Sequence, residues 1–178
     1  VMRLKPRYNP DVNQWWMCDE GRYGYAFIDQ NRLTHVQVRM GGNGHQASWD
    51  EALELIAHTI TRLKAANRLD QIGVILSTYL TNEDLHIAKR VFGELGIRHV
   101  TVQGPRPGSS DQFLLKADKS PNARGAQALG LACDSQTLLE RAARKELSVL
   151  YVFGHDLLDV FGQAAAKAAA EGLELLVF

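Results

Sequence analysis

From residue 48 onward the apolar positions follow two alternating patterns, and the first of them is helical. Five apolar residues recur every three or four positions and form one stripe: Leu53, Ile56, Ala57, Ile60 and Leu63. Ser48 and Glu51 precede this stripe at the spacing of a capping box, in which the serine oxygen accepts a bond from a free amide and the glutamate reaches back. The pattern predicts a helix that begins at Ser48 and ends near Asn67.

Beyond Asn67, short apolar runs alternate with amphipathic stretches, which is typical of a parallel sheet covered by helices. The predicted strands are 72–77, 99–103, 149–153 and 173–178. The predicted helices are about 81–95, 134–145 and 158–170, and Gly96 is expected to end the first of them. We therefore expect an α/β fold in which residues 48–178 form a Rossmann-like domain with a mainly parallel sheet. Because no loop follows the last strand, we expect this domain to be truncated at its carboxyl terminus.

The first 47 residues have a different pattern and are rich in Asn, Gly, Arg and aromatic residues. Two short stretches with alternating character, Tyr25–Ile28 and His35–Val38, predict strands joined by turns. Glycines at positions 41, 42 and 44 are expected to break the chain before the first helix. Residues 1–47 are thus predicted to form a small strand-rich lobe.

The predicted connection from Gly104 to about Ser120 is longer than ordinary loops of compact domains. It contains Pro105, Pro107 and Gly108, which favour irregular backbone. A loop of this length favours a functional or interface role.

Composition and charge exclude several classes of function. The chain has 20 basic and 20 acidic residues, so its net charge of zero disfavours a nucleic-acid partner. Its apolar runs are shorter than the ~20 residues of a membrane-spanning helix, and no secretory signal opens the sequence. Two cysteines, Cys18 and Cys133, are too few for a disulfide framework. These features favour a cytoplasmic protein without direct membrane insertion.

The candidate binding residues follow two predicted strands. Ser77 and Thr78 end the first strand, and Gly154, His155 and Asp156 follow the third. Ligands of open parallel sheets bind at the carboxyl ends of strands, so a pocket for a nucleotide-like pterin is one interpretation. The commoner explanation of such residues is turn and helix-cap chemistry. No glycine-rich phosphate loop or nucleophile elbow occurs in the sequence.

Two blocks of residues resemble a known family. The first comprises Val12-Asn13, Cys18, Gly21-Arg22, Arg32-Leu33-Thr34 and Ser48-Trp49-Asp50-Glu51-Ala52. It resembles the molybdopterin oxidoreductase family around the last cysteine of the amino-terminal [4Fe-4S] site. The second comprises Thr81-Asn82-Glu83-Asp84, Pro107-Gly108-Ser109-Ser110-Asp111, Lys116-Ala117-Asp118-Lys119-Ser120-Pro121-Asn122 and Gly125-Ala126. It looks like the branch that contains the large iron–sulfur subunit of bacterial NADH:quinone oxidoreductase.

The resemblance implies that Cys18 is the fourth [4Fe-4S] ligand of a longer parent protein, with residues 1–47 adjoining that site. A cubane requires four thiolates, so no cluster is expected in this chain alone. Two departures make molybdopterin chemistry unexpected. Glu20 replaces the lysine of the family's formate dehydrogenases, and the stretch from Gly96 to Ser110 contains no cysteine for the metal.

The leading hypothesis is a fragment of the large iron–sulfur subunit, serving as scaffold and electron-transfer component without a catalytic site of its own. Its expected partners are the other subunits of a respiratory or redox complex, peripheral to the inner membrane. One alternative is a fragment of a molybdopterin-dependent, formate dehydrogenase-like oxidoreductase, and another is a stand-alone α/β binding module. The final predicted strand and the aromatic lobe also predict self-association of the isolated chain.

Overall fold

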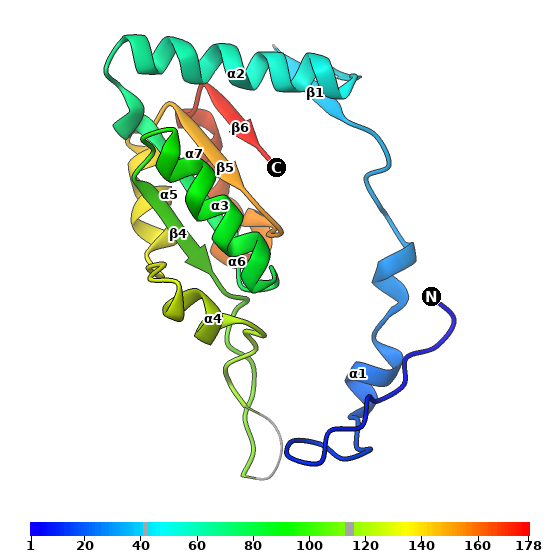
Figure 1. Ribbon diagram of the computed structural model, residues 1–178. Coiled ribbons are helices and arrows are strands. Elements are labelled where there is room, and N and C mark those ends of the chain that lie inside the picture. The colour runs from blue at the N-terminus through cyan, green and yellow to red at the C-terminus, as the bar shows by residue number, and fades with distance from the viewer. Residues whose placement is uncertain (41–42, 113–115) are drawn as a thin grey trace. The chain divides into compact units, whose positions relative to one another are not determined.

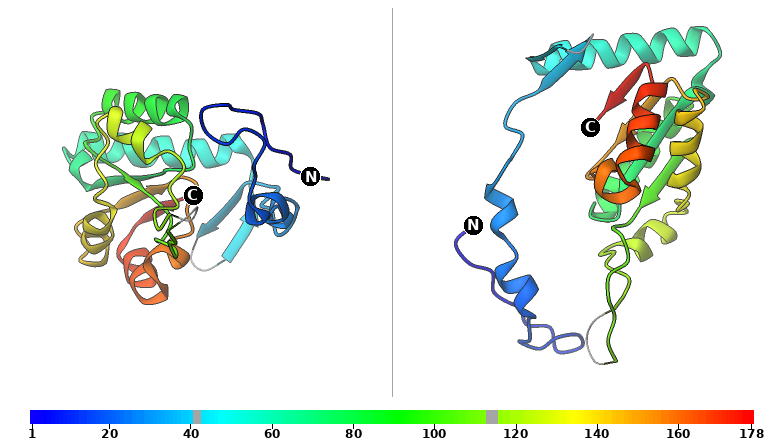
Figure 2. Two further views of the ribbon diagram at one scale, coloured as in Figure 1. Left: turned by 90° about the horizontal axis from the view of Figure 1, so that it is seen from below. Right: turned by 180° about the vertical axis from the view of Figure 1, so that it is seen from behind.

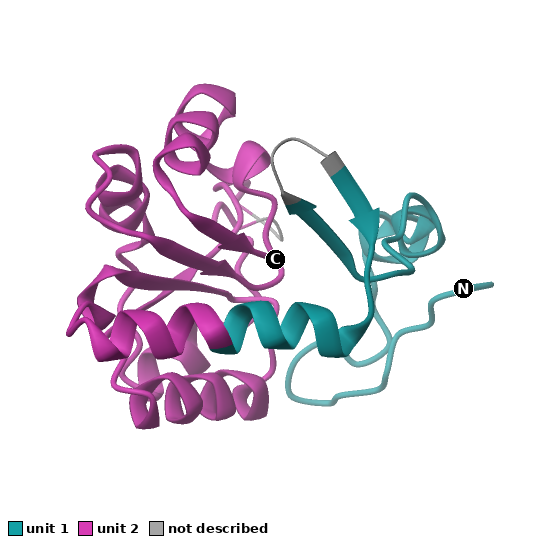
Figure 3. Cartoon of the chain, turned by 90° about the horizontal axis from the view of Figure 1, so that it is seen from above, with its two compact units in different colours: residues 1–57 teal, residues 58–178 magenta. Residues whose placement is uncertain are grey.

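The computed structural model describes residues 1–40, 43–112 and 116–178. The chain divides into two compact units, which are considered separately below (Figure 3). Unit 1 comprises Val1–Ala57 and unit 2 comprises His58–Phe178. The division falls within one helix, α2 (Trp49–Ala65).

Unit 2 is built on a parallel sheet of four strands. In spatial order these are β4 (His99–Gln103), β3 (Ile72–Ser77), β5 (Val149–Val152) and β6 (Leu175–Val177). All three pairings are parallel. The prediction of an α/β fold with a mainly parallel sheet covered by helices is confirmed (Figure 1). The bounds of β3 and β4 are those predicted, whereas β5 ends one residue earlier and β6 is shorter.

Helices cover both faces of this sheet. The helices of unit 2 after β3 are α3 (Asn82–Glu94), α4 (Ala123–Ala128), α5 (Ser135–Ala143), α6 (Leu157–Phe161) and α7 (Gln163–Gly172), and a short 3-10 turn, η2 (Leu69–Gln71), precedes β3. Viewed from behind, α5 and α7 lie on the face opposite α3 (Figure 2). Successive side chains of a strand point to opposite faces, so neighbouring residues of β5 contact different helices.

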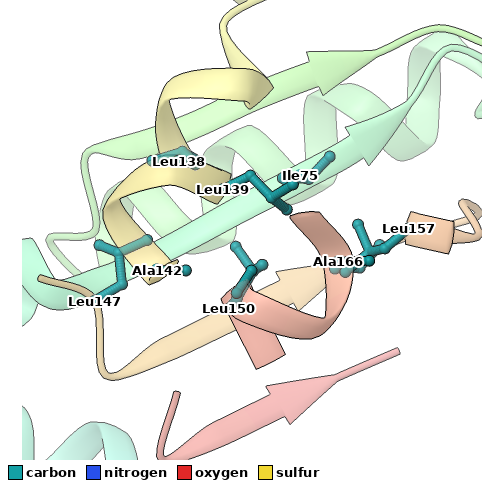
Figure 4. Packing of buried hydrophobic residues seen from close by; sticks show 10 residues of the cluster. Ile75, Leu138, Leu139, Ala142, Leu147, Leu150, Leu157 and Ala166 are labelled. Atoms are coloured by element: carbon teal, nitrogen blue, oxygen red, sulfur yellow. The ribbon is translucent and has the colours of Figure 1, made fainter. Parts of the chain in front are cut away.

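The main hydrophobic core lies between the sheet and the pair α5 and α7. Leu138, Leu139 and Ala142 of α5 pack with Ile75 of β3 and Leu150 of β5 (Figure 4). All of these side chains are buried, and a fully buried leucine stabilises the fold by roughly 1.5–3 kcal/mol. On the other face, Tyr151 of β5 contacts Phe92 of α3 with ring centroids 5.2 Å apart.

Local signals account for the ends of α3. Thr81 Oγ1 accepts a bond from the amide of Asp84, and the Asp84 carboxylate accepts one from the amide of Thr81. This reciprocal cap satisfies two amides that a helix start leaves free. Gly96 follows the helix with φ of +86°, a conformation that favours glycine, so the predicted stop is confirmed.

The predicted helix 158–170 is wrong in one respect, because two helices occupy that stretch. Gly162 has φ of +86° and is both the C-cap of α6 and the N-cap of α7. Its amide donates to the carbonyl of Leu158 at 3.0 Å, which closes α6. The short helix α4 was not predicted, since its six residues carry no clear apolar stripe.

Unit 1 contains a short helix, α1 (Asp19–Tyr23), a 3-10 turn, η1 (Ala26–Asp29), and an antiparallel pair, β1 (Gln37–Met40) with β2 (Asn43–Gln46). The predicted strand Tyr25–Ile28 is wrong, because η1 occupies that stretch. Alternation indicates a strand only where one face is buried, and Phe27 remains 67% exposed. The predicted strand at His35–Val38 begins two residues later, and Gly41 and Gly42 lie outside the described residues.

Helix α2 confirms the helix predicted from Ser48. Ser48 Oγ accepts a bond from the amide of Glu51 at 3.1 Å, while the Glu51 carboxylate pairs with His45 Nε2 at 2.8 Å. The predicted apolar stripe is buried only toward its end, where Leu63 is fully buried and Leu53 is 54% exposed. None of the helices in the described ranges is long and apolar enough to span a membrane.

Candidate functional site

The sheet reverses its winding direction at β3, and the candidate residues lie at this point. The chain passes from β3 to β4 on one side and later returns to β5 on the other side. Connections that leave in opposite directions open a crevice at the carboxyl ends of the two central strands. Ser77 ends β3, Thr78 follows it, and Gly154, His155 and Asp156 follow β5. The topology therefore brings all five predicted candidates to the same edge.

Gln103 at the end of β4 joins the strand ends to one another. Its backbone oxygen accepts a bond from the amide of Thr78 at 3.0 Å and a second bond from Nε2 of His155. Its side-chain oxygen accepts a bond from the hydroxyl of Ser135, the first residue of α5. Sequence reasoning missed Gln103 and Ser135. The available signal was that Gln103 is a polar residue at a strand end, like Ser77.

Two of the five predicted candidates make local side-chain bonds, and Gly154 makes a close approach. Ser77 Oγ accepts from the amide of Tyr79 at 3.0 Å, and Asp156 Oδ1 accepts from the amide of Leu158 at 2.8 Å. Gly154 has φ of +68°, and a Cβ placed on it would lie 3.1 Å from Cβ of Ser77. These are turn, cap and close-approach contacts, which fix the strand ends without requiring a ligand.

Thr78 differs from the other candidates. Its Oγ1 is buried and has no hydrogen-bond partner among the described residues. A Cβ placed on Gly104, the residue after β4, would lie 3.6 Å from this oxygen and 2.4 Å from Oγ of Ser120. Thr78 thus lies beneath the point where the long loop leaves the sheet and returns to it.

The described parts of the long loop, 104–112 and 116–120, are held at a few points. The amide of Gly108 donates to the carbonyl of Ala117 at 2.8 Å, which joins the outgoing and returning segments. Arg106 Nε donates to the carbonyl of Val160 at 3.0 Å, near the end of α6. Figure 1 shows this loop projecting from the edge of the sheet where β4 ends.

A shallow groove of about 640 Å³ lies where the long loop returns to α4. Its lining includes Asp118, Ser120, Arg124 and Cys133. The backbone and side chain of Ser120 donate hydrogen bonds that lower the pKa of the Asp118 carboxyl. Cys133 is exposed and directly precedes Asp134, the cap of α5. The groove offers one cation, one carboxylate and one thiol, but its described lining holds no arrangement of three metal ligands.

Cys18 lies in unit 1 as the cap residue of α1. Its Sγ accepts a bond from the amide of Gly21 at 3.3 Å, and the side chain is exposed. No group of three or more His, Cys, Asp or Glu side chains in residues 1–40, 43–112 and 116–178 could hold a metal ion. A cubane takes four thiolates, so the described residues do not provide a complete ligand set, and the assignment of Cys18 as one ligand stays a prediction.

Comparison with known proteins gives the family. The Molybdopterin oxidoreductase family model matches residues 32–123, which is more than half of the chain. The chain belongs to the molybdopterin oxidoreductase family. The match includes the helix start at Ser48, all of β3 and β4, and the long loop.

The chain is also similar to subunits of NADH-quinone and NADH-ubiquinone oxidoreductases. The NADH-quinone oxidoreductase subunit 3 of Thermus thermophilus is 30% identical over 125 residues, covering 66% of this chain and 16% of the relative. An NADH-quinone oxidoreductase subunit of Rickettsia felis is 31% identical over 102 residues, covering 57% and 15%. The mitochondrial NADH-ubiquinone oxidoreductase 78 kDa subunit of Candida albicans is 34% identical over 118 residues, covering 66% and 16%. The chain thus spans about a sixth of the length of these relatives.

Proposed function

We propose that this chain is a segment of the large iron–sulfur subunit of an NADH:quinone oxidoreductase. The similarity to three subunits of such enzymes, at 30–34% identity over 102–125 residues, carries the proposal. In this assignment, residues 1–47 adjoin a [4Fe-4S] site of the parent and residues 48–178 form its Rossmann-like domain. The parent passes electrons through iron–sulfur clusters at the surface of the inner membrane, in contact with the other subunits of its complex.

In the proposed parent, unit 2 acts as a scaffold and contains no catalytic site. The contacts at the carboxyl edge support this role. Ser77, His155 and Asp156 each use a side-chain atom to hold a turn, a strand end or a helix start. A pterin would have to compete with these bonds, and among the five described candidates only Thr78 has a free hydroxyl, which is buried.

Cys18 would contribute one thiolate to the cluster in the parent, and the cluster would supply one-electron transfer. The contribution of this chain is to hold the sulfur in place. The amide of Gly21 donates a hydrogen bond to Sγ at 3.3 Å, which fixes the position of the sulfur at the start of α1. A Cβ placed on Gly21 would lie 3.5 Å from Sγ, which is an ordinary van der Waals contact.

Metal analysis of the full-length parent protein tests the proposal. Replacing Cys18 by serine should remove about four iron atoms per subunit and one [4Fe-4S] signal in electron paramagnetic resonance. Cys133→Ser is the matched control and should leave both unchanged. The scaffold assignment is wrong if the parent contains molybdenum or tungsten at about one atom per chain, a result that would favour the formate dehydrogenase-like alternative. Equal iron in the Cys18 variant and the parent would remove the cluster assignment.

A further inference from the structure

A second groove lies on unit 2, away from the strand ends, between α3 and the end of α4. It has a volume of about 400 Å³ and is lined by His86, Lys89, Arg90, Gly93, Glu94 and Leu129. Five of these residues belong to α3 and recur at three- or four-residue spacing, so the groove follows the helix for about two turns. A surface of this shape accommodates another helix better than a compact small molecule.

Gly93 leaves an open space in this groove. A Cβ placed on it would meet no atom of the described chain within 4 Å. Glycine in a helix costs up to about 1 kcal/mol relative to alanine, and here no contact within the described chain requires it. A glycine on a helix surface lets a neighbouring helix approach closely, because the distance between two helix axes depends on the side chains at the contact.

Positively charged side chains outnumber carboxylates in the described lining of the groove. The only carboxylate in the described lining, Glu94, already pairs with Arg90 at 2.8 Å. Lys89 has no carboxylate partner among the described residues and donates one bond, at 2.5 Å, to the carbonyl of Leu129. An ammonium group has three donors, so two remain for a carboxylate from outside.

We propose that this groove binds an amphipathic, acidic helix of another protein subunit. A carboxylate of that helix pairs with Lys89, and a small apolar side chain one turn away fills the space over Gly93. Lys89 and Gly93 are four residues apart on α3, so the two partner groups are one helical turn apart. The identification of the partner as a subunit of the same complex rests on the proposed function. The preference of the groove for an acidic helix rests on its residues alone.

Cross-linking in the assembled complex tests the partner. A photo-cross-linking residue replaces Gly93 in the full-length parent, and the same residue replaces Glu171 on the exposed side of α7 as control. The expected product from position 93 alone joins the parent to a helix of another subunit that carries Asp or Glu beside the cross-link. An assembled complex with no such product, or with a product to a basic segment, overturns the proposal and leaves the proposed function intact.

A binding measurement on the 178-residue chain tests the chemistry separately. The probe is a synthetic helix that carries Glu and Ala one turn apart on one face. Lys89→Glu and Gly93→Leu should each weaken binding by roughly tenfold or more, equivalent to about 1.4 kcal/mol, whereas Lys167→Glu on α7 should not. Equal binding by all variants, or no binding of the probe, overturns the proposal. If the 178-residue chain binds the probe but the full-length parent joins no complex, the proposed function is wrong and the groove proposal stands.

Discussion

Replacing Gly172 by alanine should destabilise unit 2, although the same change usually stabilises a helix. Gly172 ends α7, and a Cβ placed on it would lie 1.9 Å from the carbonyl oxygen of Ala142 in α5. Helix propensity favours alanine by up to about 1 kcal/mol. Inserting an atom into a packed contact costs about 1–3 kcal/mol, and here the neighbouring atom is backbone, which yields less than a side chain. We expect a net loss of about 1–2 kcal/mol.

Urea and thermal unfolding followed by circular dichroism measure this change. A loss of that size should lower the melting temperature by roughly 2–8 °C for a domain of this size. Gly93→Ala is the matched control, since the same added methyl group meets open space near the end of α3 and should leave stability equal or higher. The packing argument is refuted if Gly172→Ala is as stable as the parent chain, or if both variants change stability alike.

Three further predictions follow from other positions. Tyr151→Phe should leave stability unchanged or raise it by about 1–3 kcal/mol in denaturant titration, because the buried hydroxyl has no partner among the described residues. The same burial raises the pKa of Tyr151 to about 12. A clear loss of stability in the variant would contradict the assignment of an unpaired hydroxyl. Burial and the charge of Arg141 lower the pKa of His99 below 6.5. The folded state therefore binds this proton less readily than the unfolded state. The free energy of unfolding should fall as the pH drops below about 6.5. His99→Gln should flatten that part of the stability profile, and an identical profile for the variant would contradict this assignment. The isolated chain should self-associate at high concentration through β6, an edge strand with no charged residue, and a monomer at all concentrations in size-exclusion chromatography would count against this expectation.

The sequence predicted the sheet well because its central strands have a simple pattern. All six residues of β3 are buried, and a buried strand of a parallel sheet appears as a continuous apolar run between turn residues. Thr81 and Gly96 then marked the ends of α3 through side-chain and backbone chemistry that acts within a few residues. Local signals of this kind can be identified without knowledge of the tertiary structure.

The errors arose where the outcome depends on contacts from elsewhere. Tyr25–Ile28 alternates like a strand, but Phe27 stays exposed and no neighbouring strand pairs with this stretch in the described chain. The apolar stripe of α2 is real, yet Leu53 remains exposed while Leu63 is fully buried. Periodicity shows which residues share a face, and the packing partner decides how much of that face is buried.

The candidate site was only partly accessible to sequence reasoning. Ser77 and His155 were identified because they follow predicted strands, and the topology places them at one edge. Their individual bonds could not be predicted, since Gln103 meets His155 across a sequence separation of 52 residues. The groove along α3 was missed for the same reason, because it joins residues of α3 to Leu129 at the end of α4. The lining of the other groove is local in sequence, from Asp118 to Cys133, but its shape depends on how the long loop returns to α4.

The position of β3 between β4 and β5 also has a consequence for the order of folding. Gly73 of β3 pairs with His99 of β4, and Ile72 of β3 pairs with Val149 of β5. The loop that closes when β5 joins β3 is therefore roughly three times as long as the loop that closes when β4 joins it. That difference raises the entropic cost of closure by about 1 kcal/mol, before any ordering of the long loop is counted. During synthesis, β3, α3 and β4 can assemble as a half-sheet while the rest of the chain is still emerging. The side of β3 that later receives β5 has no strand partner in that interval, so its backbone amides and carbonyls stay unpaired until β5 is made.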